Sequence, residues 1–136
     1  MKKRVFQKTL FPYVIDASSL INIERNKKMI QLRKHKGEIL MPEKVAEEVN
    51  QPNTPLSRFI DSYPQVITQF HDNEEEEYLR VRSQVGIDDG EAAAIAIAFK
   101  RKLPLVIEDK KGKAKAENHG IQTFDWKYFL REEKSG

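Results

Sequence analysis

With 136 residues the chain is long enough to bury one continuous core, and the absence of cysteine excludes disulfides and thiolate zinc sites. Its 24 basic and 21 acidic side chains leave a net charge of +3, which permits a polyanionic partner without requiring one. The apolar stretch 10–15 contains Pro12 and is too short to cross a membrane, and no signal-peptide core follows the basic start. We therefore predict a soluble, cytoplasmic protein with a basic arm over 1–9, a single domain over 10–132 and a tail over 133–136.

The first half of the chain alternates apolar runs, typical of buried strands, with amphipathic segments, typical of helices. Ser18 or Ser19 can cap the first helix, and Pro42 suits the first turn of another. The expected elements are a strand over 11–16, a helix after Ser18 or Ser19, a basic segment over 25–36, a strand over 38–41, a helix from Pro42 that ends before Pro52, a helix over 55–62 and a strand over 66–70.

The second half is dominated by a helix that begins at Asp88. Its run 92–99 is small and apolar on nearly all sides, which predicts a central position and places Phe99, like Tyr78, in the core. A helix over 72–84 precedes it, and a strand over 103–107, a helix over 110–119 and a strand over 121–124 follow. Because parallel neighbours need crossover helices, this alternation predicts an α/β fold, a three-layer α/β/α sandwich with a mainly parallel sheet.

Carboxylates stand where apolar runs end or helices begin, which is where open α/β folds gather their sites. Several carboxylates at one edge repel one another unless cations lie among them, so we expect a divalent metal held by oxygen ligands, Mg²⁺ or Mn²⁺. The acids concerned are Asp16, Glu48, Asp88, Asp89, Glu91 and Asp109.

Each acid also has a plainer interpretation. Asp16 could be a turn residue or an N-cap, although Ser18 and Ser19 can already supply that cap. Glu48 could be a solvated charge on a helix, and Asp88 with Glu91 forms a capping-box pattern. For Asp109, capping of the next helix and metal ligation stay equally open.

Together, four segments in order resemble the motifs of the PIN-domain family of metal-dependent ribonucleases, over roughly residues 10–125. The third segment has the Asp-x-Gly-Glu-Ala pattern of one prokaryotic subgroup, the VapC-like toxin ribonucleases, whereas the region 121–124 is shorter than in the family. The matching segments are Asp16-Ala17-Ser18-Ser19-Leu20-Ile21, Pro42-x-x-Val45-x-x-Glu48, Asp88-Asp89-Gly90-Glu91-Ala92, and Asp109 followed by Lys110-Lys111-Gly112-Lys113-Ala114.

The resemblance implies an endoribonuclease, the toxin of a toxin–antitoxin pair, that binds RNA and a small antitoxin and forms a homodimer. A housekeeping RNA-processing nuclease and a catalytically silent nucleic-acid-binding module of the same fold are the alternatives. A haloacid-dehalogenase-type site is disfavoured because it expects Asp-x-Asp, whereas position 18 is Ser.

In this interpretation the catalytic acids are Asp16, Glu48, Glu91 and Asp109. Three of them, Asp16, Glu91 and Asp109, bind metal, and Glu48 is a ligand or a water-orienting base. Ser18 would hydrogen-bond an acid or a metal-bound water, with Asp88 and Asp89 as alternates to Glu91.

Basic and aromatic residues allow two interpretations each. Lys110, Lys111 and Lys113 either contact RNA phosphates or form a solvated helix face, together with Lys115. His35, His71 and His119 stand in polar surroundings at no ligand spacing, so we expect surface histidines. The aromatic run Phe124, Trp126, Tyr128 and Phe129 is too closely spaced for one core face, so part of it is expected at a partner surface.

Overall fold

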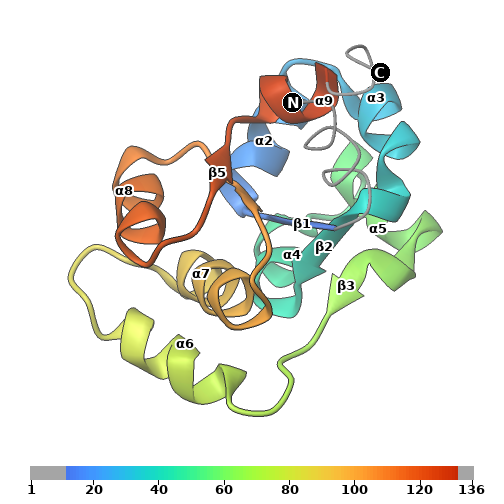
Figure 1. Cartoon of the computed structure of the whole chain (residues 1–136). Helices are drawn as coiled ribbons and strands as arrows, with labels where there is room; N and C mark the ends of the chain where they lie inside the picture. The colour runs from blue at the N-terminus through green and yellow to red at the C-terminus, as the bar shows by residue number, and fades with distance from the viewer. Residues whose placement is uncertain (1–11, 132–136) are drawn as a thin grey trace.

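The computed structural model describes residues 12–131 and shows a five-stranded, all-parallel sheet with strand order β3-β2-β1-β4-β5 (Figure 1). The predicted arm over 1–9 and tail over 133–136 lie outside the described residues. The strands are β1 (Tyr13–Ile15), β2 (Ile39–Pro42), β3 (Ile67–Thr68), β4 (Leu105–Val106) and β5 (Thr123–Phe124). The predicted parallel sheet is therefore confirmed.

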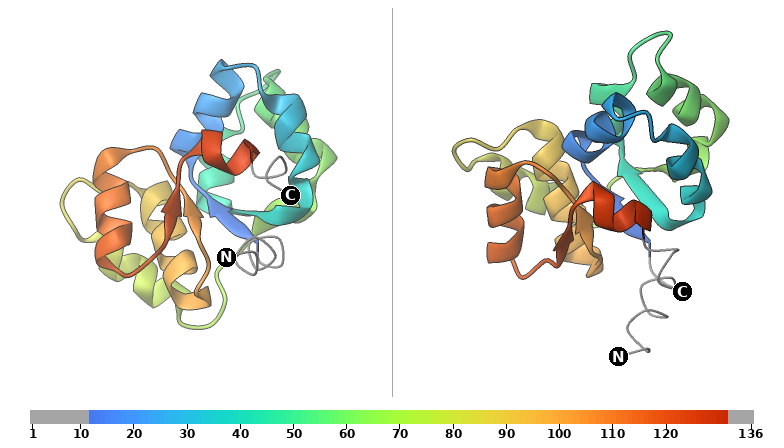
Figure 2. Two further views of the ribbon diagram at one scale, coloured as in Figure 1. Left: turned by 45° about the horizontal axis from the view of Figure 1, so that its top comes forward. Right: turned by 90° about the horizontal axis from the view of Figure 1, so that it is seen from above.

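Strand residues alternate between two cores, one on each face of the sheet. In β1, Tyr13 and Ile15 face one core and Val14 faces the other. Helices α6 (Glu74–Arg82), α7 (Asp89–Arg101) and α8 (Lys110–Asn118) form the layer on the Val14 side (Figure 2). The helices that pack into the core on the other side are α2 (Ala17–Arg25), α3 (Met29–Lys34), α4 (Glu43–Val49), α5 (Pro55–Ser62) and α9 (Trp126–Arg131). These layers confirm the predicted α/β/α sandwich.

Helix α7 is the central helix of its layer, as its composition predicts. Every residue from Gly90 to Ala98 is buried, so the helix is covered on nearly all sides. Alanine side chains keep the helix thin enough for the sheet and neighbouring helices to approach it closely. This packing holds the N-terminus of α7 at the carboxyl edge of the sheet. None of the helices over 12–131 is long and apolar enough to span a membrane.

Several elements differ in extent from the expectation. Four strands are shorter than the predicted runs, because only two or three residues of each run form the strand. β2 has the predicted length but is shifted by one residue, so Pro42 ends the strand and is the N-cap of α4, not part of its first turn as predicted. The basic segment 25–36 contains α3, whose Met29 and Leu32 are buried. Two short 3₁₀ turns, Lys36–Glu38 and Pro64–Val66, precede β2 and β3.

Two predicted burial states are wrong. His35 is buried against the ring of Phe129, with 4.9 Å between ring centres, and its Nδ1 lies 3.0 Å from Glu38 Oε1. The polar sequence around His35 hides this contact because Phe129 lies far along the chain. Phe99 is 40 % exposed at the C-terminal end of α7, where it meets His119 edge-on. In the aromatic run Trp126 and Phe129 are buried, whereas Tyr128 is 37 % exposed.

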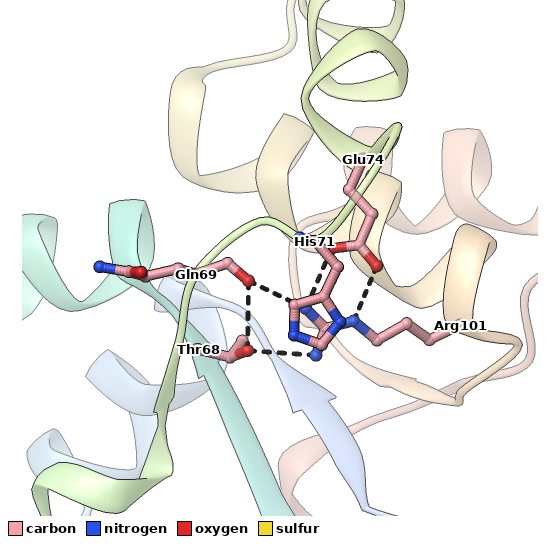
Figure 3. Close-up of polar contacts among 5 residues, drawn as sticks. All are labelled: Thr68, Gln69, His71, Glu74 and Arg101. Carbon is pink, nitrogen blue, oxygen red and sulfur yellow. Dashed lines mark hydrogen bonds and ion pairs between the residues drawn. The ribbon is translucent and has the colours of Figure 1, made fainter.

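A polar cluster ties the ends of α6 and α7 to β3 (Figure 3). The Arg101 guanidinium donates to both Glu74 oxygens (2.8 and 2.9 Å), to Thr68 Oγ1 (3.1 Å) and to the Gln69 carbonyl (2.9 Å). Glu74 is 3 % exposed. Burial acts to raise its pKa, but hydrogen bonds from Arg101 and from the His71 backbone N–H outweigh burial and lower the pKa. The Glu74–Arg101 ion pair therefore joins the first residue of α6 to the last residue of α7.

Candidate active site

Asp16 follows β1 directly and is the N-cap of α2. Its carboxylate accepts hydrogen bonds from the Ser18 backbone N–H (3.4 Å) and from Ser18 Oγ (2.9 Å). The expectation that Ser18 or Ser19 caps this helix is therefore wrong, since both lie inside it. Asp16 is only 2 % exposed, and burial raises its pKa to about 6 against the opposing hydrogen bonds.

Ser18 joins two strand ends that are remote in sequence. While its hydroxyl donates to Asp16, its oxygen accepts from the backbone N–H groups of Glu108 (3.0 Å) and Asp109 (3.3 Å). Because β1 and β4 pair in parallel, their carboxyl ends meet at this edge. One hydroxyl thus holds the turn that carries Asp109 against Asp16.

The N-terminus of α7 brings Asp88 and Glu91 to the same edge. Asp88 caps the helix by accepting from the Glu91 backbone N–H (2.9 Å). The Glu91 side chain turns inward and is 7 % exposed. Burial raises its pKa to about 8, helped by a hydrogen bond with Asp109 and by the charges of Asp16, Asp109 and Asp88.

Asp109 is the N-cap of α8 and accepts from the Gly112 backbone N–H (2.8 Å). Its pKa is lowered, first by the hydrogen bond with Glu91 and then by that from Gly112 and by the charge of Lys111. Of the two carboxyl groups, Glu91 therefore has the higher pKa and favours its protonated form more than Asp109 does. Capping and ligation do not compete here, because a carboxylate offers two oxygens and about four lone-pair sites.

Two glycines leave the space that these carboxylates occupy. A Cβ on Gly112 would lie 2.6 Å from Glu91 Oε2 and 2.8 Å from Ile107 Cδ1. A Cβ on Gly90 would lie 2.6 Å from Glu48 Oε1. Real Cβ atoms do not approach so closely, so each glycine is needed for the observed carboxylate position.

Glu48 lies on α4 at the rim of the site. It lines an open pocket of about 380 Å³ with Lys44, Glu47, Asp88, Asp89 and Gly90. Burial raises its pKa, as do the charges of Asp88, Asp16 and Asp89. The structure thus brings Glu48 into the electrostatic reach of the other acids, although it lies on a different helix.

Asp89 is occupied by a different set of partners. Tyr78 Oη donates to Asp89 Oδ1 (3.1 Å), and the Arg82 Nε forms an ion pair with the same oxygen. The hydrogen bond from Arg82, followed by that from Tyr78, lowers the pKa of Asp89. Of the two alternates to Glu91, Asp88 adds to the raised pKa of Asp16, Glu48 and Glu91, whereas Asp89 adds only to that of Glu48 and is itself paired with a cation.

The predicted phosphate-binding lysines lie on the first turn of α8, directly after Asp109. Lys110 and Lys111 are exposed and Lys113 is half-buried. Among residues 12–131, none of the three forms an ion pair within 4.0 Å. Their charges face solvent beside the acids.

A family model described as "DUF3368: PIN domain" matches residues 12–127, which is most of the chain. The chain belongs to the PIN-domain family. The PIN domain also has the fold of a solved structure, PAE2754 from Pyrobaculum aerophilum, with a TM-score of 0.62 at 19 % identity over 93 % of this chain and 98 % of the other. No curated protein matches the chain. PIN domains are in general nucleases, and they typically use divalent metals.

The donor chemistry of this PIN domain fits a hard divalent cation. The acids that interact are carboxylates only, and two glycines make room for them. Burial raises the pKa values of Asp16 and Glu91, and the charges of neighbouring acids add to both shifts. Within 12–131, no three acidic or histidine side chains are arranged to ligate one ion together.

Sequence reasoning missed the role of Glu108, which neighbours a predicted ligand. Its carboxylate accepts from the Trp126 backbone N–H (2.7 Å) and so holds the start of α9. Alternation along β4 could have indicated this. Val106 packs into the core on the α9 side of the sheet, and Ile107 packs into the core on the α7 side. Continued alternation predicts that Glu108 points toward the α9 side and Asp109 toward the α7 side.

Proposed function

We propose that this PIN domain is a Mg²⁺- or Mn²⁺-dependent endoribonuclease. The observation that carries the proposal is the convergence of Asp16, Glu91 and Asp109 at one sheet edge. The Ser18 hydroxyl hydrogen-bonds both the Asp16 carboxylate and the Asp109 backbone N–H, and Gly112 leaves room for the Glu91 carboxylate. Burial, aided by the charges of Asp16, Asp109 and Asp88, raises the Glu91 pKa to about 8, and a cation at this edge would offset the negative charge of the acids.

Asp16, Glu91 and Asp109 would hold the ion. When bound, it would lower the pKa of a water and offset charge on a scissile phosphodiester. Glu48 lies on the open side of the pocket, where its raised pKa suits a residue that accepts a proton from an attacking water. Ser18 would keep Asp16 and Asp109 in register through its three hydrogen bonds.

The test is cleavage of single-stranded RNA by purified protein with Mg²⁺ or Mn²⁺, with EDTA, and with Zn²⁺ alone. We expect cleavage only with the hard ions, because oxygen-only ligands favour them. Asp16→Asn should abolish cleavage without unfolding the protein, since Asn caps helices as well as Asp does. Asp61→Asn, an exposed acid on α5, is the matched control. Cleavage in EDTA, or by a folded Asp16→Asn protein, would refute the metal mechanism.

The position of cutting is tested with circular RNA. An endonuclease linearises a closed single-stranded circle, whereas an exonuclease leaves it intact. Glu48→Gln should lower turnover more than RNA affinity if Glu48 orients water. Tight RNA binding without cleavage by the wild type would instead favour the binding-module alternative.

The toxin role belongs to the same proposal and has a separate test. Exposed apolar side chains such as Ile30, Leu79 and Val85 offer surface for an antitoxin or a second copy. Induced expression should arrest growth, Asp16→Asn should not, and a short neighbouring reading frame should reverse the arrest. Light scattering should show a dimer. Growth unaffected by active enzyme would favour an RNA-processing role.

A further inference from the structure

One cation lies in the acidic pocket on the side away from α8. Lys44 of α4 lines the pocket beside Glu47, Glu48 and Asp88, and its side chain is half-buried. Its Nζ lies 5.1 Å from the centre of the Tyr78 ring, which supports the lysine stem. Within 12–131 the Lys44 ammonium has no ion pair within 4.0 Å, so its charge remains available to a ligand.

Lys44 is not required to neutralise Asp89. Asp89 is already paired with Arg82 and hydrogen-bonded by Tyr78. Lys44 also lowers the Asp89 pKa, but its contribution is smaller than that of either of these partners. Lys44 is not a freely solvated lysine either, because its side chain is half-buried, its Nζ lies over the Tyr78 ring, and it lines the acidic pocket.

The N-terminus of α7 lies between the two helices that carry cations (Figure 1). Gly90 faces Glu48 and Val45 of α4, whereas Glu91 faces Gly112 of α8. Lys44 therefore flanks the acids on the α4 side, and the lysines of the first α8 turn flank them on the other.

We propose that Lys44 binds an RNA phosphate on the α4 side of the acids, so that the strand crosses the α7 N-terminus between Lys44 and the α8 lysines. This inference rests on the proposed ribonuclease function and adds a substrate-positioning residue to it. The physical reason is that the acids repel a polyanion. Cations on both flanks offset that repulsion for the phosphates on either side of the scissile one.

The test measures binding of a labelled single-stranded RNA in the cleavage-deficient Asp16→Asn background, in EDTA, across roughly 50–200 mM KCl. Lys44→Met keeps the stem over Tyr78 but removes the charge. It should reduce the slope of log K against log salt by about 0.7, the value for one phosphate contact on a single strand. Lys44→Arg should restore the slope. Lys100→Met, an exposed lysine in the last turn of α7, should leave it unchanged.

In the Asp16-containing enzyme, Lys44→Met should raise KM more than it lowers kcat. An unchanged salt slope and KM in a folded Lys44→Met protein would overturn the proposal, as would a lower Tm with no change in slope. Lys44→Gln is a second neutral variant if Met impairs folding. Failure of the wild type to cleave any RNA would instead refute the proposed function, because the binding slope is measured without cleavage.

Discussion

Gly112→Ala should separate catalysis from stability in this PIN domain. The added Cβ would lie 2.6 Å from Glu91 Oε2 and 2.8 Å from Ile107 Cδ1, both of which are ends of flexible side chains. To restore an ordinary contact of 3.4 Å, the Glu91 oxygen must withdraw by about 0.8 Å. The methyl group thus displaces a proposed metal ligand and leaves the backbone in place.

The expected effects on activity and on stability differ in size. A displacement of this order at a reacting centre costs on the order of 10²-fold in rate, so cleavage should fall by roughly that factor. Overpacking costs about 1–3 kcal/mol, whereas Ala in place of Gly within a helix returns about 1 kcal/mol. The free energy of unfolding should therefore fall by no more than about 2 kcal/mol.

The assay pairs initial cleavage rates with urea denaturation of the same preparations. Gly37→Ala is the matched control, because a Cβ there would meet nothing within 4 Å. It should leave both measurements nearly unchanged. Full activity in Gly112→Ala, or equal loss of activity and of folded protein, would refute the assignment of Glu91 to the site.

Three further predictions concern pH, packing and charge. The Glu91 pKa is raised from its ordinary value of 4.5 to about 8, so between these pH values the folded metal-free protein holds more protons than the unfolded chain. The Tm of the wild type should therefore fall as the pH rises from about 4.5 to 8. Glu91→Gln should flatten this dependence of Tm on pH. An equally steep profile in the variant would contradict the shift. Arg101→Met should lower the free energy of unfolding in urea by about 3 kcal/mol by leaving the buried Glu74 unpaired, and adding Glu74→Gln should recover part of that loss. A loss below about 1 kcal/mol would show that the pair is not limiting. Lys110→Ala combined with Lys111→Ala should reduce the salt slope of RNA binding by about 1.4, and an unchanged slope would indicate a solvated helix face.

Local patterns predicted much of the candidate site. Asp16, Asp88 and Asp109 each stand at a strand end or a helix start, whereas Glu48 lies in the last turn of α4. Strand ends of a parallel sheet share an edge, so Asp16 and Asp109 could be placed together in advance. Ligand and cap looked like competing roles for Asp88 and Asp109, yet both residues are caps beside the other acids. The choice between Asp88 and Asp89 depended on Tyr78 and Arg82, which approach from another helix.

Periodicity and composition by themselves determined the order of strands and helices, the central place of the alanine-rich helix and the parallel sheet, because these follow from short-range backbone preference and from which residues avoid water. Contacts between remote segments decided the rest. The burial of His35 on Phe129, the raised pKa of Glu91 beside Asp109, and the position of the Lys44 ammonium over Tyr78 arise from groups that only the folded chain brings together. Electrostatic shifts depend on distance and desolvation in space, and sequence spacing measures neither across a crossover connection.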